Sequence, residues 1–325
     1  MNRRRPGLHL AIALTLATAV ASAQPSPARI AWIGPSDAAG QAKYIASFKD
    51  GMSDNGLVEG RNYVLDAQYA DGHYDRFPAM IDAALKRDPA LIMAITIASV
   101  RAAQLATNSV PIVFMSTNDP VGSGLVASLA RPGGNTTGIS NQAEDVIVKY
   151  VELVHATLPR AKRVAVLLNP DNPSNQRMFE LVRAAADASG MTAVAYEAAS
   201  PEAIDSALDA IARQRPDALI QNSDAMLIQH RDRIAAFALK QRIPAIGTSP
   251  EAADSGYLLA YGADRLEIYR RAANYARKIL AGARPADLPV EQPTRFKLII
   301  NLKTAKALGL TIPQSLLLRA DEVIQ

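Results

Sequence analysis

The fold is decided by the stretch RVAVLLNPDNPSNQRMFELVRAAADASGMTAVAYEA, residues 163–198. It begins with an apolar segment typical of a strand, continues through a polar loop into an amphipathic helix, and reaches an alternating strand after a Ser-Gly stop. Residues 29–69 follow the same order, from RIAWIG through a helix that stops at Asn55-Gly56 to NYVLDAQY. Because one strand–helix–strand order is laid out twice, the sequence predicts two similar α/β lobes.

Other short apolar runs continue this pattern in both halves of the chain. Each is a candidate for a buried strand, and the helix-length runs between them predict parallel sheets covered on both faces. These runs are LIMAI (91–95), PIVFM (111–115), DALIQN (217–222), IPAIGT (243–248) and YLLAYG (257–262).

The last segment of the chain does not extend a simple tandem of lobes. A helix over 266–282 is followed by the proline-rich run 283–293, then by the strand KLIIN (297–301) and a short helix that ends at Gly309. A chain that builds two lobes in this way needs such segments, which return to the lobes and complete them. We therefore expect two Rossmann-like lobes joined by three links.

The predicted lobes are discontinuous in sequence. Lobe 1 comprises residues 28–141 plus 262–288, and lobe 2 comprises residues 142–261 plus 289–325. The predicted links lie near 140–144, 260–263 and 286–294.

Residues 1–23 have the layout of a cleaved signal peptide. Three arginines precede the apolar stretch Leu10–Val20, and Ala21-Ser22-Ala23 forms an A-x-A cleavage site. The alternative is a membrane anchor, but this stretch is shorter than the roughly 20 residues that span a bilayer. The chain has no cysteine, so it offers no disulfide and no thiol for a lipid. We therefore expect a periplasmic protein, without a lipid anchor and monomeric.

Charge and motif spacing argue against several function classes. The chain has 35 Lys+Arg and 31 Asp+Glu, and loss of Arg3, Arg4 and Arg5 leaves 32 against 31, a nearly neutral mature chain. No basic run follows, so we expect no nucleic-acid partner. The chain has no cysteine for thiolate ligands and lacks the spacings H-E-x-x-H, G-x-S-x-G and G-x-x-x-x-G-K-[ST]. We expect no metal, no cofactor and no catalytic residue.

The stretch NDPVGSGLVASLARPGGNTTGIS, residues 118–140, contains G-x-G-x-x-A after an apolar run, and Glu144 stands 20 residues beyond Gly124. This matches a dinucleotide-binding fingerprint. In that fingerprint the first glycine directly ends the strand, whereas here residues 116–121 intervene and include Pro120. The sequence therefore argues against a nucleotide. It predicts instead a short helix opened by the glycines, a turn at RPGGN, and a link towards the second lobe.

Short polar side chains follow the predicted strands in both lobes. In parallel α/β sheets, ligands bind at the carboxyl ends of strands, beside helix N-termini. For each residue the alternative is that it only caps the next helix, which contributes about 1 kcal/mol. The occurrence of the set in both lobes favours a polar cleft. The candidate ligand-binding residues are Ser36, Thr96, Ser99, Asn118, Asp119, Asn169, Asn172, Asp224, Thr248 and Tyr261.

Two blocks of the sequence resemble a known family. They are VPIVF (110–114) with the stretch 118–140, and FKLIINLKTAKALGLTIPQSLLLRADEVI (296–324). Both are similar to the ABC-transporter substrate-binding family that includes tryptophan- and tyrosine-type receptors, and the similarity runs from about Arg29 to Ile324. The resemblance implies the type I periplasmic-binding fold, in which two α/β lobes and a three-segment hinge close on a small solute. It also implies delivery to an ABC permease of the inner membrane, and no catalysis.

For an amino-acid ligand, the candidate residues divide into roles. The carboxylate suits Ser99, with the N-terminal amides of its helix, and Ser36. The ammonium suits Asp224 or Asp119, and Tyr261 suits an aromatic side chain. Two other functions stay open: a solute-sensing module for a membrane receptor, and an exported hydrolase on the same fold. The mature chain has only three histidines, which argues against a hydrolase.

Overall fold

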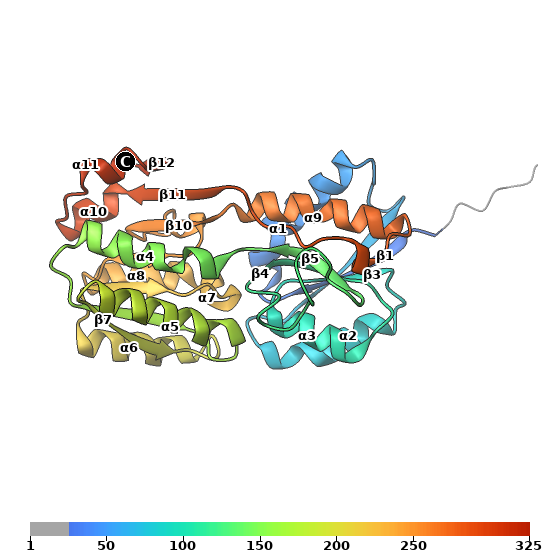
Figure 1. Ribbon diagram of the computed structural model, residues 1–325, viewed down its shortest axis with the longest axis horizontal. Coiled ribbons are helices and arrows are strands. Elements are labelled where there is room, and N and C mark those ends of the chain that lie inside the picture. The colour runs from blue at the N-terminus through green and yellow to red at the C-terminus, as the bar shows by residue number, and fades with distance from the viewer. Residues whose placement is uncertain (1–25) are drawn as a thin grey trace, which may run out of the picture.

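The protein consists of two α/β lobes that lie end to end along its longest axis (Figure 1). A computed structural model describes residues 26–325, and the predicted signal peptide, 1–23, lies outside the described residues. Within 26–325, no helix combines the length and the apolar character that crossing a bilayer requires. The prediction of two α/β lobes is confirmed.

The N-terminal lobe is built on a parallel sheet in the order β2-β1-β3-β4-β5. Its strands are β1 (Ala28–Gly34), β2 (Tyr63–Tyr69), β3 (Leu91–Ala94), β4 (Ile112–Thr117) and β5 (Thr136–Ser140). Its helices are α1 (Ala38–Asp54), α2 (Phe77–Leu85), α3 (Ile97–Ala106) and α9 (Arg265–Leu280), with short 3₁₀ turns η1 (Tyr74–Arg76) and η3 (Pro285–Asp287).

Both faces of this sheet are buried, as the continuous apolar strands predict. Successive side chains of a strand point to opposite faces. In β1, Ile30 and Trp32 therefore join the core under α1 and α9, whereas Ala31 and Ile33 join the core under α2 and α3. The predicted helix stop is also confirmed, since Gly56 has a φ of 76°.

The C-terminal lobe is built on a seven-stranded sheet in the order β12-β11-β10-β9-β8-β6-β7. Its strands are β6 (Arg163–Leu168), β7 (Thr192–Glu197), β8 (Ala218–Gln221), β9 (Ala245–Gly247), β10 (Leu259–Ala263), β11 (Phe296–Asn301) and β12 (Glu322–Ile324). Its helices are α4 (Ala143–Thr157), α5 (Pro173–Ala188), α6 (Ala203–Gln214), α7 (Ala225–Gln229), α8 (Arg231–Lys240), α10 (Leu302–Leu308) and α11 (Gln314–Leu317), with the 3₁₀ turn η2 (Pro250–Ala252).

This second sheet is not wholly parallel, and here the prediction needs correction. β10 and β11 pair antiparallel, and β12 pairs parallel with β11. The reason lies in the path of the chain: β10 runs towards the other lobe, the chain crosses to form α9, and β11 runs back on its return (Figure 1). The remaining strands are parallel.

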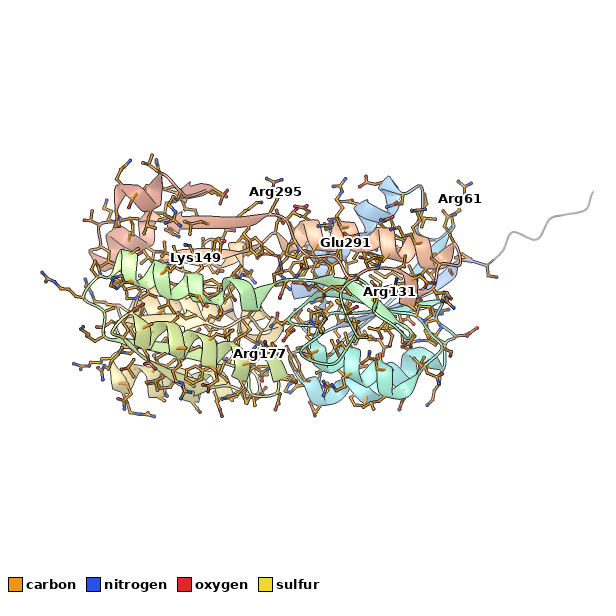
Figure 2. All side chains as sticks on the ribbon, viewed as in Figure 1. Arg61, Arg131, Lys149, Arg177, Glu291 and Arg295 are labelled. Atoms are coloured by element: carbon orange, nitrogen blue, oxygen red, sulfur yellow. The ribbon has the colours of Figure 1, made fainter. Side chains whose placement is uncertain are left out.

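The chain passes between the lobes three times. The first crossing follows β5 at residues 141–142, the second follows β10 near Asp264, and the third precedes β11. The first and third segments lie side by side, since Glu291 N donates to Gly138 O at 3.1 Å and Ser140 N donates to Glu291 O at 2.9 Å. Figure 2 shows Glu291 beside this junction.

The lobe boundaries stay predictions. β10 remains in the seven-stranded sheet through Ala263, although the predicted boundary lies at 261/262. Val290 N still donates to Leu129 O of the N-terminal lobe at 2.7 Å, although the predicted boundary lies at 288/289.

The predicted short helix after the glycines of residues 118–140 is wrong. In the described chain, no helix forms between β4 and β5, and turns take its place. Leu125 N donates to Pro120 O at 2.9 Å, and Gly124 has a φ of 67°. A left-handed residue at this point reverses the backbone, so the helical turn cannot continue.

Gly122 of the same stretch is required by its neighbours. A Cβ atom there would lie 2.0 Å from Asp119 Oδ2 and 2.6 Å from Arg177 Nη1. Asp119 and Arg177 form a salt bridge of 2.6 Å that joins the lobes, and Figure 2 shows Arg177 near the boundary between them. The glycine thus makes room for an ion pair and not for a nucleotide.

Candidate ligand-binding cleft

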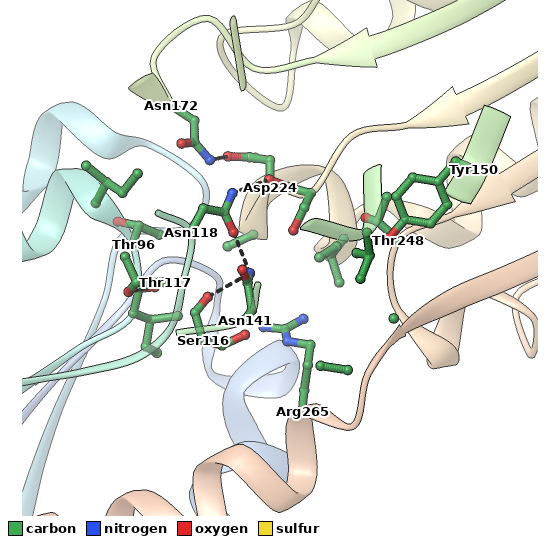
Figure 3. Close-up of a pocket in the computed structure, with 18 residues that line it drawn as sticks. Thr96, Ser116, Thr117, Asn118, Asn141, Tyr150, Asn172, Asp224, Thr248 and Arg265 are labelled. Atoms are coloured by element: carbon green, nitrogen blue, oxygen red, sulfur yellow. Dashed lines mark hydrogen bonds between the residues drawn. The ribbon is translucent and has the colours of Figure 1, made fainter. Parts of the chain in front are cut away.

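A cavity lies between the two lobes, at the carboxyl ends of the parallel strands (Figure 3). Parallel strands bring these ends to one edge of each sheet. The N-terminal lobe contributes Thr96, Ser116, Thr117 and Asn118, and the C-terminal lobe contributes Asn172, Ser223, Asp224 and Thr248. Asn141 lines the cavity from the first crossing, Gly262 from the end of β10, and Arg265 from the start of α9.

The last residues of β4 are turned towards the cavity by a bulge. The register of β4 against β5 shifts between Met115 and Thr117, and Ser116 has a φ of 56°. Bulges often re-aim side chains at binding sites, and strained non-glycine residues cluster there as well. Ser116 and its neighbours thereby face the cleft.

Thr96 and Ser99 act as a cap for α3. Thr96 Oγ1 accepts from Ser99 N at 3.1 Å, and Ser99 Oγ accepts from Thr96 N at 3.0 Å, which is a capping box. Ser99 is fully buried and is not part of the cavity wall. The local fold therefore accounts for the hydrogen bonds of Ser99.

Asn118 links the two lobes directly. Its Nδ2 donates to Ser174 Oγ at 2.7 Å and to Ser223 O at 3.2 Å, both in the C-terminal lobe. Its Oδ1 accepts from Asn141 Nδ2, at the first crossing (Figure 3). A buried side chain bonded on both sides of the cleft favours the closed arrangement of the lobes.

Asp224 is the carboxylate of the cavity wall. It caps α7, with Oδ1 accepting from Met226 N at 3.0 Å, and its Oδ2 accepts from Asn172 Nδ2 at 2.9 Å and from Tyr74 Oη at 3.0 Å. Tyr74 belongs to the N-terminal lobe. Burial raises the pKa of Asp224, against the effect of these hydrogen bonds. Among the described residues no salt bridge reaches it, so the donors around it are neutral.

Arg265 is the guanidinium of the cavity wall. It is the first residue of α9, directly after the second crossing, and is only 9% exposed. Its guanidinium carbon lies 4.5 Å from the centroid of the Tyr44 ring. Although burial disfavours the charge, nearby Tyr44, Tyr269 and Glu251 hold the pKa of Arg265 above its ordinary value. Arg265 therefore stays charged inside the protein.

Two polar atoms at this end of the cavity make no hydrogen bond within the described structure. They are Nη1 of Arg265 and Oγ1 of Thr248, both buried. Both residues line the same cavity. Buried polar groups are ordinarily paired, so this end of the cleft differs from the saturated surroundings of Asp224.

The lobes stand close together. The cavity leaves about 50 Å³ open to the centre of a water molecule, and one water needs about 10–15 Å³ on that measure. The space therefore suits a few waters, and a larger solute requires the lobes to move apart. Contacts between the lobes include Lys43 Nζ to Glu251 Oε1 at 3.3 Å, in addition to the Arg177–Asp119 pair.

Five of the ten predicted site residues line this cavity, and five do not. The lining residues are Thr96, Asn118, Asn172, Asp224 and Thr248. The others are Ser36, Ser99, Asp119, Asn169 and Tyr261. The ligand-binding role of all ten stays a prediction.

The five residues outside the lining have identifiable local contacts. Ser36 accepts from Gln41 Nε2 at 2.6 Å and lines a second hollow, between α1 and the residues 225–231. Asp119 pairs with Arg177. Asn169 lies behind Asp224, to which it donates at 3.4 Å. Tyr261 packs against other aromatic rings, Tyr150 and Phe296 among them. Ser99 serves the capping box described above.

Sequence reasoning missed Tyr74, Asn141 and Arg265. Arg265 stands immediately after the loop 261–264 that the strand pattern identified, so extending that loop by one residue would have found it. Tyr74 lies in a loop of the N-terminal lobe and meets Asp224 only through lobe closure. No local signal in the sequence predicts that contact.

A family model described as ABC transporter substrate binding protein matches residues 31–324. The chain is 27% identical over 263 residues to a protein named "Tyrosine-binding protein" from Clostridioides difficile (strain R20291). The aligned region covers 81% of this chain and 75% of that protein.

Solved structures show the same fold. A domain from Streptococcus pneumonia in complex with L-Trp is 24% identical, covers 92% of this chain and 100% of its own, and superposes with a TM-score of 0.85. The ligand-free, open form of a substrate-binding protein from Clostridium difficile is 23% identical, covers 92% and 99%, and superposes with a TM-score of 0.64. The lobe arrangement of this chain is thus nearer to the first of these two structures.

Proposed function

Because the chain belongs to the ABC transporter substrate-binding protein family, we propose that it is a receptor that binds a small solute between its lobes and delivers it to an ABC permease. The observation that carries this proposal is the cavity with walls from both lobes. A solute that contacts both walls binds the closed form more tightly than the open form, and so it shifts the population towards closure. Closure is then the signal that a permease can read.

The proposed solute is an amino acid with an apolar or aromatic side chain. The cavity wall holds one carboxylate, Asp224, and one guanidinium, Arg265. It also holds Ile95, Ile97 and Tyr150, which suit an apolar group. The name of the curated relative from Clostridioides difficile supports the same class.

The proposed setting is the periplasm. The signal-peptide layout of residues 1–23 and the lack of cysteine support export without a lipid anchor. We also propose that the receptor acts as a monomer and carries out no catalysis, in keeping with the solute-binding proteins to which it is related.

Mass spectrometry of small molecules released by unfolding the freshly purified protein tests the solute class. The expected result is one amino acid, present in near-stoichiometric amount and absent from a sample that was unfolded and refolded beforehand. Release of a sugar, and no amino acid, would overturn the amino-acid class and leave the receptor function standing. Turnover of the released molecule by the protein would overturn the receptor function.

A further inference from the structure

Two residues that line the cavity near the second crossing, Arg265 and Thr248, each carry a buried polar atom without a hydrogen-bond partner in the described chain, Nη1 of Arg265 and Oγ1 of Thr248. We propose that Arg265 and Thr248 bind the carboxylate of an α-amino acid whose ammonium lies at Asp224. This inference rests on the proposed function and names the part of the solute that each end of the cavity receives. It also moves the carboxylate away from Ser99 and Ser36, the residues that the sequence suggests.

Ser99 and Ser36 are poorly placed to bind a carboxylate. Ser99 Oγ donates to Thr96 O at 2.9 Å and accepts from Thr96 N, so its hydrogen-bonding capacity is used in the helix cap. Ser36 lines a second hollow, which Arg265 borders as well, and there Ser36 Oγ already accepts a hydrogen bond from Gln41 Nε2. Neither residue lines the cavity that Asp224 lines.

Arg265 has the opposite properties. In the described chain it forms no salt bridge; its guanidinium carbon lies 4.5 Å from the centroid of the Tyr44 ring, Tyr269 is its side-chain hydrogen-bond partner, and Nη1 stays without a partner. Glu251 offsets part of its charge, but the hydrogen bonds of Glu251 Oε1 come from Lys43 at 3.3 Å and from Tyr44 Oη at 3.2 Å. A buried guanidinium with an unpaired N–H group in a solute cavity is suited to a carboxylate, which accepts from it in a charge-assisted hydrogen bond.

Thr248 and Arg265 are brought to the same wall by a close backbone contact. Thr248 follows β9, and Gly262 of the neighbouring strand β10 packs against it. A Cβ atom on Gly262 would lie 2.6 Å from Thr248 O, so only glycine permits this approach. Figure 3 shows Thr248 and the Arg265 side chain around the space that Asp224 borders from the other side.

The two ends of the cavity then select a zwitterion. In the described chain Asp224 accepts only from neutral donors, and Arg265 forms no salt bridge, although Glu251 offsets part of its charge. An α-amino acid brings an ammonium for Asp224 and a carboxylate for Arg265 in one small molecule. An amine without a carboxylate would leave Arg265 unpaired, and the affinity should fall accordingly.

The test combines a substitution of Arg265 with removal of the carboxylate charge from the ligand, as in a double-mutant cycle. The probes are L-tyrosine and L-tyrosinamide, which lacks the carboxylate charge. If calorimetry shows that another common L-amino acid binds more tightly than L-tyrosine, that amino acid and its amide replace the two probes. We expect wild type to bind the amide about 100-fold more weakly than the acid. We expect Arg265→Gln to bind the acid about 100-fold more weakly than wild type, and the amide within about 3-fold of wild type.

A structural role for Arg265, such as offsetting Glu251, predicts a different pattern. In that case Arg265→Gln weakens the acid and the amide equally, and this result would overturn the proposal. Arg270→Gln is the matched control, because Arg270 lies on the same helix and is 54% exposed at its side chain. Its affinity for both probes should equal that of wild type.

Two measurements do not depend on the folding of Arg265→Gln. Wild-type protein that binds the acid and the amide equally would overturn the inference while the proposed function stands. Thr248→Val, which keeps the shape of the side chain, should weaken the acid by about 10-fold, and an unchanged affinity would remove Thr248 from the site. If wild type binds no L-amino acid at all, the proposed solute class fails together with the inference.

Discussion

Two buried carboxylates of the C-terminal lobe, Asp224 and Glu251, meet the N-terminal lobe in opposite ways. Asp224 accepts from neutral donors, among them Tyr74, and burial raises its pKa. Glu251 accepts from Lys43 and Tyr44; although burial acts to raise its pKa, Arg265 and Lys43 lower it to about 2. The Glu251 contact therefore contains its own counter-charge, whereas the Asp224 contact leaves a charge for a solute to match. The Glu251 contact joins the lobes, and under the proposed function the Asp224 contact also binds the ammonium of the solute.

The largest expected effect concerns Glu251. Its pKa is lowered in the folded protein from 4.5 to about 2, which corresponds to about 3 kcal/mol of stability. Because a lowered acid pKa stabilises the fold only above its unfolded value, this contribution is present at neutral pH and is lost as the pH falls from about 4.5 to about 2. Glu251→Gln should therefore unfold more easily than wild type at pH 7 and approach it at low pH. Urea unfolding of both proteins between pH 7 and pH 2 measures the difference in unfolding free energy. A difference that does not change with pH would contradict the prediction.

The next effect concerns Asp224, where the pH dependence has the opposite sign. A raised pKa means that the folded state holds the proton more tightly, so the contribution of Asp224 to stability decreases as the pH rises above 3.8. Asp224→Ala removes the cap of α7 and the acceptor of Tyr74, and should lower the unfolding free energy by about 2 kcal/mol. It should also weaken amino-acid binding by about 10-fold or more. An unchanged dissociation constant in calorimetry would remove Asp224 from the site.

A smaller effect isolates the contact between the lobes. Tyr74→Phe deletes the hydroxyl that donates to Asp224 at 3.0 Å and should disfavour closure by about 1 kcal/mol, which lowers the apparent affinity by about 5-fold. Tyr275→Phe is the comparison variant, because its hydroxyl donates to Pro289 O at 2.6 Å, on the N-terminal-lobe side of the third crossing, and neither residue lines the cavity. It should lower stability without a change in affinity. Equal affinity losses in both variants would show that Tyr74 has no specific part in closure.

The smallest effect is expected at the surface. Arg177 pairs with Asp119 across the lobes, but its side chain is 63% exposed, and exposed pairs contribute about 0.2–1 kcal/mol. Arg177→Gln should change the apparent affinity by less than about 5-fold, and the difference should disappear at high salt. Calorimetric titrations at low and high salt measure the affinity of Arg177→Gln relative to wild type. A loss of affinity as large as that of Asp224→Ala would contradict the expected order of effects.

The sequence predicts the fold well where one local pattern carries the information. Apolar strands such as β1 alternate with amphipathic helices, and Asn55-Gly56 ends α1 as expected. The antiparallel direction of β11 was missed because it depends on where the chain crosses between the lobes. The absent helix after Gly122 was missed because Gly124 adopts a left-handed conformation that ends the turn, and because Gly122 packs against an ion pair with the other lobe.

The site is only partly predictable, for a related reason. Polar residues at strand ends, such as Asn172 and Thr248, can be found from the strand pattern alone. Ser99 fits that same pattern but caps its own helix. Tyr74 becomes part of the site through lobe closure, and the significance of Arg265 depends on its lack of a bonded partner. Both are tertiary facts that no local pattern contains.

Calorimetric titration of the refolded, ligand-free protein with the common L-amino acids tests the central claim most directly. The account predicts that at least one apolar or aromatic L-amino acid binds with a stoichiometry of one, and that the amide of that amino acid binds far more weakly. Absence of binding by every L-amino acid would contradict the claim that this cleft receives a zwitterion between Asp224 and Arg265.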